Sequence, residues 1–141
     1  MGYTNYWCCA PKLPAGAFKA AVSDCQKALE HAGITLAGPI GIGSPVFRPD
    51  AVAFNGSERQ GLETFAISRS EPPRNRRELY FCKTNHLPYD LCVQVALIVF
   101  AHHIGGAFQV SSDGGDADWD AARRICQEHL GYGQGSVLTQ P

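Results

Sequence analysis

Residues 88–103, with the sequence PYDLCVQVALIVFAHH, carry the strongest secondary-structure signal in the chain and decide its fold class. The apolar side chains of this stretch are Leu91, Val93, Val95, Leu97, Ile98, Val99 and Phe100. Because they are not confined to one face, the pattern predicts a helix that is buried on most sides. Gly105 and Gly106 end this helix. A buried helix must be covered by other elements, which the rest of the chain has to supply.

Two amphipathic helices are predicted to cover it. The first ends near Gly33, a residue type common just after a helix, and its apolar positions are Phe18, Val22, Cys25 and Leu29. The second spans residues 118–130, and its apolar positions are Trp119, Ala122, Ile125, Cys126 and Leu130. Both patterns repeat every three or four residues, as one buried helix face requires.

Alternating or β-branched runs predict strands at residues 3–9, 51–54, 62–70, 79–82 and 107–112. The second and third are expected to pair antiparallel through a loop at residues 55–61. Residues 38–49, rich in glycine and proline, are expected to be an irregular connection. The element order therefore predicts an α+β fold: a mainly antiparallel sheet with a buried central helix and two amphipathic helices packed on it. We expect one domain over residues 1–131 and a flexible tail or oligomer arm over residues 132–141.

Composition narrows the classes of partner. The 141 residues include 12 basic and 13 acidic side chains, for a net charge of −1. This balance argues against a nucleic acid polymer or an anionic membrane surface as the main partner. No apolar stretch reaches the roughly 20 residues that span a bilayer, and the first residues lack the features of a secretory signal. We therefore expect a cytoplasmic protein. We also expect it to form a homo-oligomer.

The six cysteines do not suggest a metal centre or a disulfide framework. Several of them, such as Cys25, Cys92 and Cys126, fall at apolar helix positions. Cys8 and Cys9 would point to opposite faces of a strand. Since the sequence contains neither C-x-x-C nor H-x-x-x-H, we expect reduced and mostly buried thiols, no metal ion and no cofactor.

A candidate anion site precedes the buried helix in the block Phe81-Cys82-Lys83-Thr84. Lys83, Thr84 and backbone amides at the helix N-terminus could hold a phosphate or a carboxylate. Alternatively, Thr84 is only a helix cap and Lys83 is solvated. The block lacks the flanking glycines of a P-loop.

Polar and aromatic residues elsewhere could recognise the rest of a nucleotide. Ser112 and Asp113 follow a predicted strand and could contact a ribose or another sugar, although Asp113 would also suit a turn. Tyr6 and Trp7, together with Tyr3, could stack on a base. They could equally anchor the core or a subunit interface.

A further set of residues could form the wall of a base or sugar pocket, because it places polar groups beside an aromatic ring. The set comprises Asn55, Glu63, Thr64 and Phe65. The alternative is that these are ordinary residues of a hairpin. His102 and His103, in the last turn of the buried helix, favour a helix-capping role over a catalytic one.

Three blocks of the sequence resemble a family. The blocks are GYTNYW at residues 2–7, ETF at residues 63–65 and FCKTNHLPYD at residues 81–90. They are similar to an uncharacterised family of small phage and bacterial proteins, which carry G-Y-T-H-Y-W, E-T-F and F-C-K-T-x-x-x-P-Y-D. This chain departs from the family at Asn5, where the family tends to have histidine. The resemblance implies a phage or prophage context. Small phage proteins of this class include nucleotide-signal sponges of the Lockin and Sequestin type, to which the chain is similar in class and not in motif.

These observations lead to one expected function and two alternatives. We expect a phage-type anti-defence protein that binds and sequesters a nucleotide-derived immune signal, such as a cyclic nucleotide or an ADP-ribose derivative, without catalysis. The first alternative is a hydrolase or transferase that acts on a nucleotide, using Cys82, His86 or Asp113. The second is a protein-binding inhibitor of a host defence protein, using the aromatic N-terminal segment or the basic residues 74–77.

Overall fold

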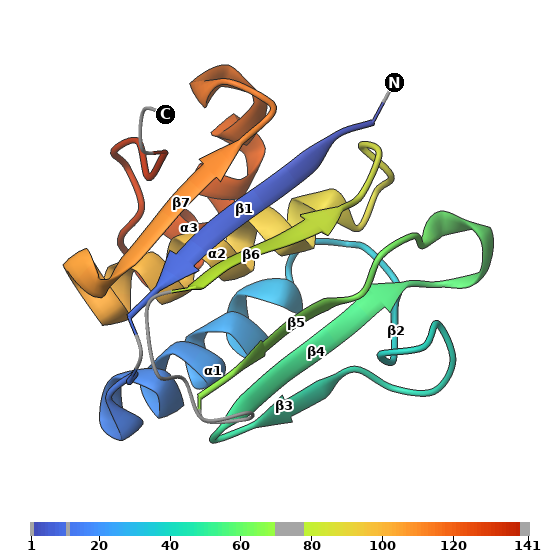
Figure 1. Cartoon of the computed structure of the whole chain (residues 1–141). Helices are drawn as coiled ribbons and strands as arrows, with labels where there is room; N and C mark the ends of the chain where they lie inside the picture. The colour runs from blue at the N-terminus through green and yellow to red at the C-terminus, as the bar shows by residue number, and fades with distance from the viewer. Residues whose placement is uncertain (1, 11, 70–77, 139–141) are drawn as a thin grey trace.

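The stretch that decides the fold forms helix α2 (Asp90–Ile104), and every side chain from Cys92 to Phe100 is buried. The computed structural model describes residues 2–10, 12–69 and 78–138, and it confirms the α+β fold (Figure 1). The other helices are α1 (Ala15–Leu29) and α3 (Asp120–Leu130). The strands are β1 (Thr4–Cys9), β2 (Leu36–Ala37), β3 (Val46–Arg48), β4 (Ala51–Gly56), β5 (Phe65–Ser68), β6 (Glu78–Lys83) and β7 (Phe108–Ser112).

The strands form two antiparallel groups. One is a three-stranded sheet in the order β6-β1-β7. In the other, β4 pairs with β2, β3 and β5. The two groups meet where the Glu63 amide donates to the Lys83 carbonyl (3.2 Å) and the Lys83 amide donates to Glu63 Oε1 (2.7 Å). The predicted antiparallel pairing of residues 51–54 with the following strand is confirmed by the β4–β5 register.

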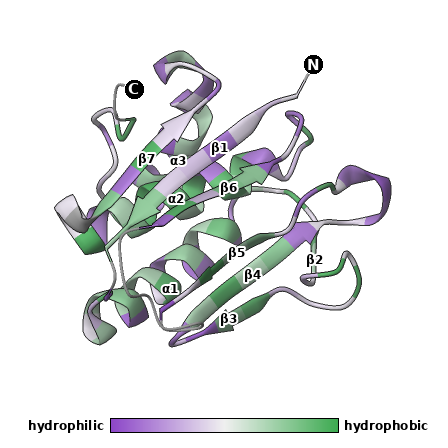
Figure 2. Ribbon diagram, viewed as in Figure 1, coloured by the Kyte–Doolittle hydropathy of each residue, from purple (hydrophilic) through white to green (hydrophobic). Residues whose placement is uncertain are grey.

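All three helices lie behind the strands, so they cover one face of the sheets, and no described helix lies on the other face, here called the open face (Figure 1). The helix α2 packs between α1 and α3, with Phe100 of α2 edge-on against Phe18 of α1 at a centroid distance of 5.0 Å. In Figure 2, β4 is hydrophobic for most of its length and becomes hydrophilic towards its end. The buried apolar side chains form one cluster that joins helices and strands into a single core.

Alternation in β1 is as the sequence predicts. Asn5 and Trp7 are buried against the helices, while Thr4, Tyr6 and Cys8 are half-buried on the open face. Five of the six cysteines are buried, and Cys8 is half-buried. None of the helices in the described parts of the chain has the length and apolar character needed to cross a membrane.

Three sequence predictions of local structure need correction. The helix α1 ends at Leu29, four residues before Gly33, because its last turn tightens into bonds from the His31 amide to Ala28 and from the Ala32 amide to Leu29. The expected irregular connection contains β3, and β2 lies just before it. These strands have three and two residues, which is too short for a visible alternation. The strand β5 is shorter than predicted, because residues 62–64 belong to the preceding loop.

The described part of the C-terminal segment, predicted as a flexible tail or an oligomer arm, lies against the domain. Tyr132, Val137 and Leu138 are partly buried and pack against the core. Leu138 forms a parallel bridge with Val110 at the outer edge of β7. Residues 139–141 lie outside the described residues, as does the arginine-rich segment 74–77.

Candidate functional site

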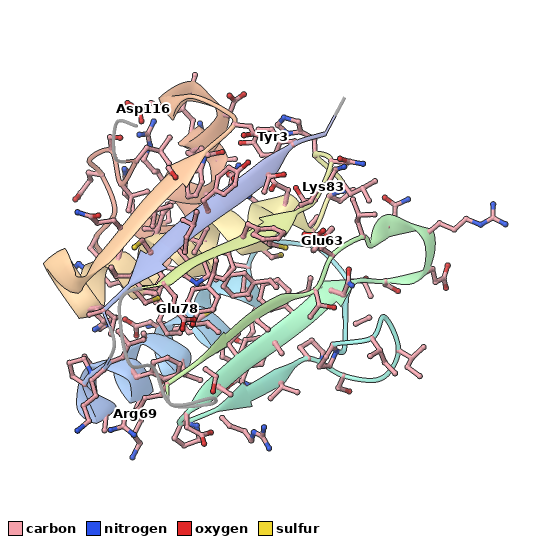
Figure 3. The ribbon with its side chains drawn as sticks, viewed as in Figure 1. Tyr3, Glu63, Arg69, Glu78, Lys83 and Asp116 are labelled. Atoms are coloured by element: carbon pink, nitrogen blue, oxygen red, sulfur yellow. The ribbon has the colours of Figure 1, made fainter. Side chains whose placement is uncertain are left out.

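The three sequence blocks that carry the family resemblance meet at one end of the β6-β1-β7 sheet. The antiparallel register places Thr4 opposite Lys83 and Asn5 opposite Ser112. The start of β1, the end of β6, the end of β7 and the start of α2 therefore lie together. In Figure 3, Tyr3, Lys83 and Glu63 are labelled in this region. We call this region the sheet end.

A buried carboxylate forms the centre of the sheet end. One oxygen of Asp90 accepts hydrogen bonds from Asn5 Nδ2 (2.7 Å) and from the Thr84 hydroxyl (2.6 Å). Its other oxygen accepts one from Gln94 Nε2 (2.9 Å). Burial raises the pKa of Asp90, and these hydrogen bonds reduce the shift. The network ties β1, β6 and α2 together beneath the sheet.

Ser112 extends the network to β7. Its hydroxyl hydrogen-bonds to Asn5 Oδ1 (2.7 Å) and to the Tyr3 hydroxyl (3.0 Å), and it accepts a bond from the Gly114 amide (3.1 Å). These contacts use the polar atoms of Ser112 inside the protein. They position the turn after β7, and with it the neighbouring Asp113.

The turn between β6 and α2 has an unusual backbone. Asn85 and His86 have φ values of 53° and 61°, a left-handed conformation that costs about 1–3 kcal/mol for a residue with a side chain. The Tyr3 carbonyl accepts bonds from the Thr84 amide (2.9 Å) and the Asn85 amide (3.2 Å). The His86 ring lies against the Tyr3 ring at a centroid distance of 3.5 Å. Tyr3 therefore holds the strained turn in place from both backbone and ring.

The open face of the sheet end carries exposed apolar, aromatic and charged groups. Phe81 is 61% exposed and Leu79 is 66% exposed, although both belong to a paired strand. The register places Phe81 directly opposite Tyr6. The Tyr6 hydroxyl donates to Asp113 Oδ1 (3.3 Å), and the Thr4 amide donates to Asp113 Oδ2 (3.0 Å). Side chains of β1, β6 and the end of β7 thus form one surface, here called the open aromatic face.

Lys83 lies at the edge of the open aromatic face. Its side chain is exposed and crosses Gly2, since a Cβ added there would lie 2.7 Å from Lys83 Cε. Within residues 2–10, 12–69 and 78–138, Lys83 has no ion-pair partner. Its ammonium group is therefore available to an anion in solution.

The structure brings several predicted site residues together at the sheet end. They are Tyr6, Glu63, Lys83, Thr84, Ser112 and Asp113. Within this group the Thr84 hydroxyl is fully buried and donates to Asp90, so it does not face an external anion. The acidic Asp90 also lies in the first turn of α2, where the anion was expected.

Two predicted aromatic contacts are wrong. Trp7 is 2% exposed and Phe65 is fully buried, with ring centroids 5.1 Å apart in the core. Neither ring offers a free face to a base. Inward side chains of β1 and β5 meet here because the helices cover this face of both strands.

Asn55 and Thr64 have the hairpin role that was the alternative for them. Asn55 Oδ1 accepts bonds from the Gly56 amide (2.7 Å) and the Leu62 amide (3.1 Å). Asn55 Nδ2 donates to the Leu62 carbonyl (3.0 Å) and to the Thr64 hydroxyl (3.1 Å). The Thr64 hydroxyl also hydrogen-bonds to the Pro39 carbonyl. These contacts close the loop after β4.

Phe81 is the residue of this region that sequence reasoning missed. The signal was present, because a strand at residues 79–82 with Cys82 inward must point Phe81 outward. Cys82, by contrast, is fully buried, and burial raises the pKa of its thiol to about 12. This high pKa argues against Cys82 as a nucleophile.

Comparison of the chain with family models, with curated proteins and with solved structures finds no match.

Proposed function

We propose that this protein binds a nucleotide-derived small molecule on the open aromatic face and holds it without changing it chemically. The observation that carries the proposal is the exposed ring of Phe81, opposite Tyr6 and two residues from the exposed Lys83. A large aromatic side chain on an uncovered sheet face loses favourable burial unless something covers it. A flat base is a suitable cover, because every base has a face that stacks on aromatic rings.

The groups around the two rings match the other parts of a nucleotide. Lys83 supplies one positive charge for a phosphate. Asp113 is an acceptor for ribose hydroxyls or for base amino groups, since each of its oxygens keeps a second lone pair. One cation on a chain of net charge −1 suits a small ligand better than a polyanion. A cyclic nucleotide or an ADP-ribose derivative has this combination of base, sugar and phosphate.

The family resemblance suggests the biological context in which this binding takes place. Three matching blocks suggest a phage or prophage protein that acts in the bacterial cytoplasm. In that setting, sequestration of a nucleotide immune signal is the function we propose.

Isothermal titration with a panel of cyclic nucleotides and ADP-ribose derivatives tests the proposal. We expect Phe81→Ala to weaken binding by about 5- to 150-fold, because stacking contributes about 1–3 kcal/mol per base. Phe81→Leu keeps an apolar side chain without the ring and should weaken binding nearly as much. Lys83→Ala should weaken binding of phosphate-bearing ligands, while Lys19→Ala on the exposed surface of α1 is the matched control.

The chemical state of the ligand separates binding from catalysis. Mass spectrometry after denaturation should recover the ligand intact, and a changed mass would favour the enzyme alternative. If wild-type protein binds no member of the panel, or if Phe81→Ala binds as tightly as wild type, the proposal is wrong.

A further inference from the structure

Helix α3 carries a polar pocket that the proposed nucleotide site does not use. The pocket has a volume of about 340 Å³ and is lined by Asp120, Arg123, Arg124, Gln127 and Gln134. Residues three or four positions apart lie on one face of a helix, so those of α3 form one wall of the pocket. Gln134 comes from the segment that follows the helix. The open aromatic face belongs to the strands, whereas α3 lies behind them (Figure 1).

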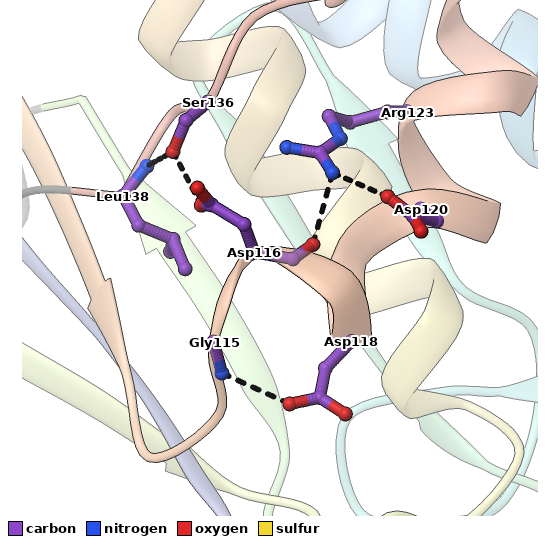
Figure 4. Close-up of polar contacts among 7 residues, drawn as sticks. All are labelled: Gly115, Asp116, Asp118, Asp120, Arg123, Ser136 and Leu138. Atoms are coloured by element: carbon purple, nitrogen blue, oxygen red, sulfur yellow. Dashed lines mark hydrogen bonds and ion pairs between the residues drawn. The ribbon is translucent and has the colours of Figure 1, made fainter.

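Arg123 is held in place within this pocket (Figure 4). Its side chain is 15% exposed. Arg123 Nη2 donates to the Asp116 carbonyl (3.0 Å) and pairs with Asp120 Oδ1. Among the described residues these are the polar partners of the guanidinium, so the donors on Nε and Nη1 are available to a ligand. Because the side chain is already ordered, it loses little further freedom when a ligand binds.

Hydrogen bonds also hold the chain around the pocket. The Ser136 hydroxyl donates to Asp116 Oδ1, and the Leu138 amide donates to the Ser136 hydroxyl (3.3 Å). Figure 4 shows that these bonds join the C-terminal segment to the turn that accepts a bond from Arg123. Gln134 precedes Ser136 by two residues, so the segment that carries it is tied to the same turn. The walls of the pocket are therefore formed before any ligand binds.

Arg124 gives the pocket an unbalanced positive charge. It is exposed, and within residues 2–10, 12–69 and 78–138 it has no ion-pair partner. Asp120 pairs with Arg123, so the pocket combines two guanidinium groups with one carboxylate. An anion beside Arg124 would balance the remaining charge, whereas Asp120 would repel an anion placed next to its carboxylate. We therefore expect an anionic group between the two arginines and away from Asp120.

Gln127 and Gln134 add neutral partners to the same pocket. Each carboxamide has two N–H donors and a carbonyl acceptor. A hydroxyl group both donates and accepts, so a carboxamide can satisfy it in either direction. Guanidinium groups match the oxygens of a phosphate. The pocket volume also falls within the range of small-molecule sites, roughly 300–1,000 Å³. These groups together fit a molecule with a phosphate at one end and hydroxyls at the other.

We propose that this pocket binds a phosphorylated polyhydroxy compound of the sugar phosphate class, with its phosphate between Arg123 and Arg124 and its hydroxyls on Gln127 and Gln134. A phosphate monoester carries a charge of about −1.5 to −2 at pH 7, so it gains more from two guanidinium groups than a carboxylate does. The site shares no residue with the open aromatic face, and it is therefore independent of the nucleotide proposal.

An NMR titration of the ¹⁵N-labelled full-length protein tests the site. Glucose 6-phosphate and ribose 5-phosphate are the probes, and at least one should shift the side-chain amide signals of Gln127 and Gln134 and the Nε signal of Arg123. Inorganic phosphate should bind more weakly because it lacks the sugar hydroxyls. Glucose, which has no charge, and glucuronate, which has a carboxylate in place of the phosphate, should bind most weakly.

Single substitutions identify the groups that bind. Arg124→Gln removes an exposed charge and leaves the bonds of Arg123 intact, so it should fold as wild type by circular dichroism and bind the sugar phosphate about tenfold or more weakly. Gln127→Leu should weaken binding of the sugar phosphate more than binding of inorganic phosphate. Arg48→Gln removes the same charge from an exposed position of β3, so it is the matched control and should bind as wild type does.

Three results would overturn the proposal. The first is that neither sugar phosphate shifts the side-chain signals of the pocket. The second is that glucose or glucuronate binds as tightly as the sugar phosphates. The third is that folded Arg124→Gln binds them with the affinity of wild type.

Discussion

At the scale of single residues, the pKa values of two carboxyl groups, Asp90 and Asp24, shift in opposite directions. Asp90 is buried among neutral donors, and burial raises its pKa. Asp24 is partly exposed, and although burial alone would raise its pKa, hydrogen bonds from His103 and Tyr132 lower it. The two groups should therefore contribute to the pH dependence of stability with opposite signs.

We predict that the contribution of Asp90 to the stability of the folded protein is lost as pH rises. Because its folded-state pKa lies above the unfolded value of 3.8, the folded state binds the proton more tightly, and the stabilisation declines as pH rises from that value through the folded pKa. Asp90→Asn keeps a neutral side chain of similar shape, so its melting temperature should vary less over this pH range. Thermal unfolding followed by circular dichroism measures the difference. An equal slope in both proteins would contradict the assignment.

For Asp24 we predict the reverse: its contribution to the stability of the folded protein is lost as pH falls. Its folded-state pKa is below the unfolded value of 3.8, so its contribution is complete above that value and is lost as pH falls through the folded pKa. Asp24→Asn should therefore lower the melting temperature at neutral pH and have little effect in strong acid. The measurement is a comparison of wild type and variant at both pH values. A constant difference between them at every pH would show that the ion pair has no such role.

At the scale of elements, helix ends explain where sequence prediction succeeded and where it was inexact. The helix α3 ends with Gly131 in the left-handed conformation, and the Gly131 amide donates to the Cys126 and Gln127 carbonyls. The helix α1 ends without a glycine in that position, since Glu30 closes it with a right-handed backbone. A glycine near a helix end is therefore a good guide only when its amide can reach the last carbonyls.

A pair of glycine substitutions tests this distinction. Gly131→Ala should destabilise the protein by roughly 1 kcal/mol, because alanine disfavours a positive φ. Gly16→Ala lies in α1 with nothing within 4 Å of the added Cβ, and it should stabilise the protein by about 0.4–1 kcal/mol. Urea unfolding gives both values. If both substitutions change the stability in the same direction, backbone conformation does not govern these positions.

At the scale of the whole molecule, Trp7 joins the two groups of strands. Its ring lies 5.1 Å from Phe65 of β5 and 6.0 Å from Tyr80 of β6, between centroids. Among the described residues, Glu63 and Lys83 carry the hydrogen bonds of the Lys83 backbone that link the two groups. Side-chain packing around Trp7 therefore joins the two groups in addition to these hydrogen bonds.

Trp7→Ala should lower the free energy of unfolding by about 3–5 kcal/mol, the usual cost of removing a large buried aromatic side chain. Tyr6→Ala, at the neighbouring but outward position, should cost much less. Urea unfolding of both variants gives the comparison. A similar loss for both would contradict the inward and outward assignment of β1.

Much of the fold could be predicted, because burial patterns repeat along the chain. The apolar run of α2, the alternation in β1 and the spacing in α1 each record one local periodicity. The candidate site was only partly predictable. Lys83 and Asp113 were identified by residue type, but the burial of Trp7 and Thr84 depends on which strands and helices lie over them.

The sequence by itself determined the α+β class, the buried central helix and the inward and outward faces of its longer strands, since side-chain periodicity follows directly from backbone geometry. Only the tertiary structure decided which polar residues meet. Asn5, Thr84 and Asp90 come together through the pairing of β1 with β6 and the position of α2. Leu138 also meets Val110 of β7 only in the folded chain. Contacts between distant residues depend on register and packing, which no local pattern records.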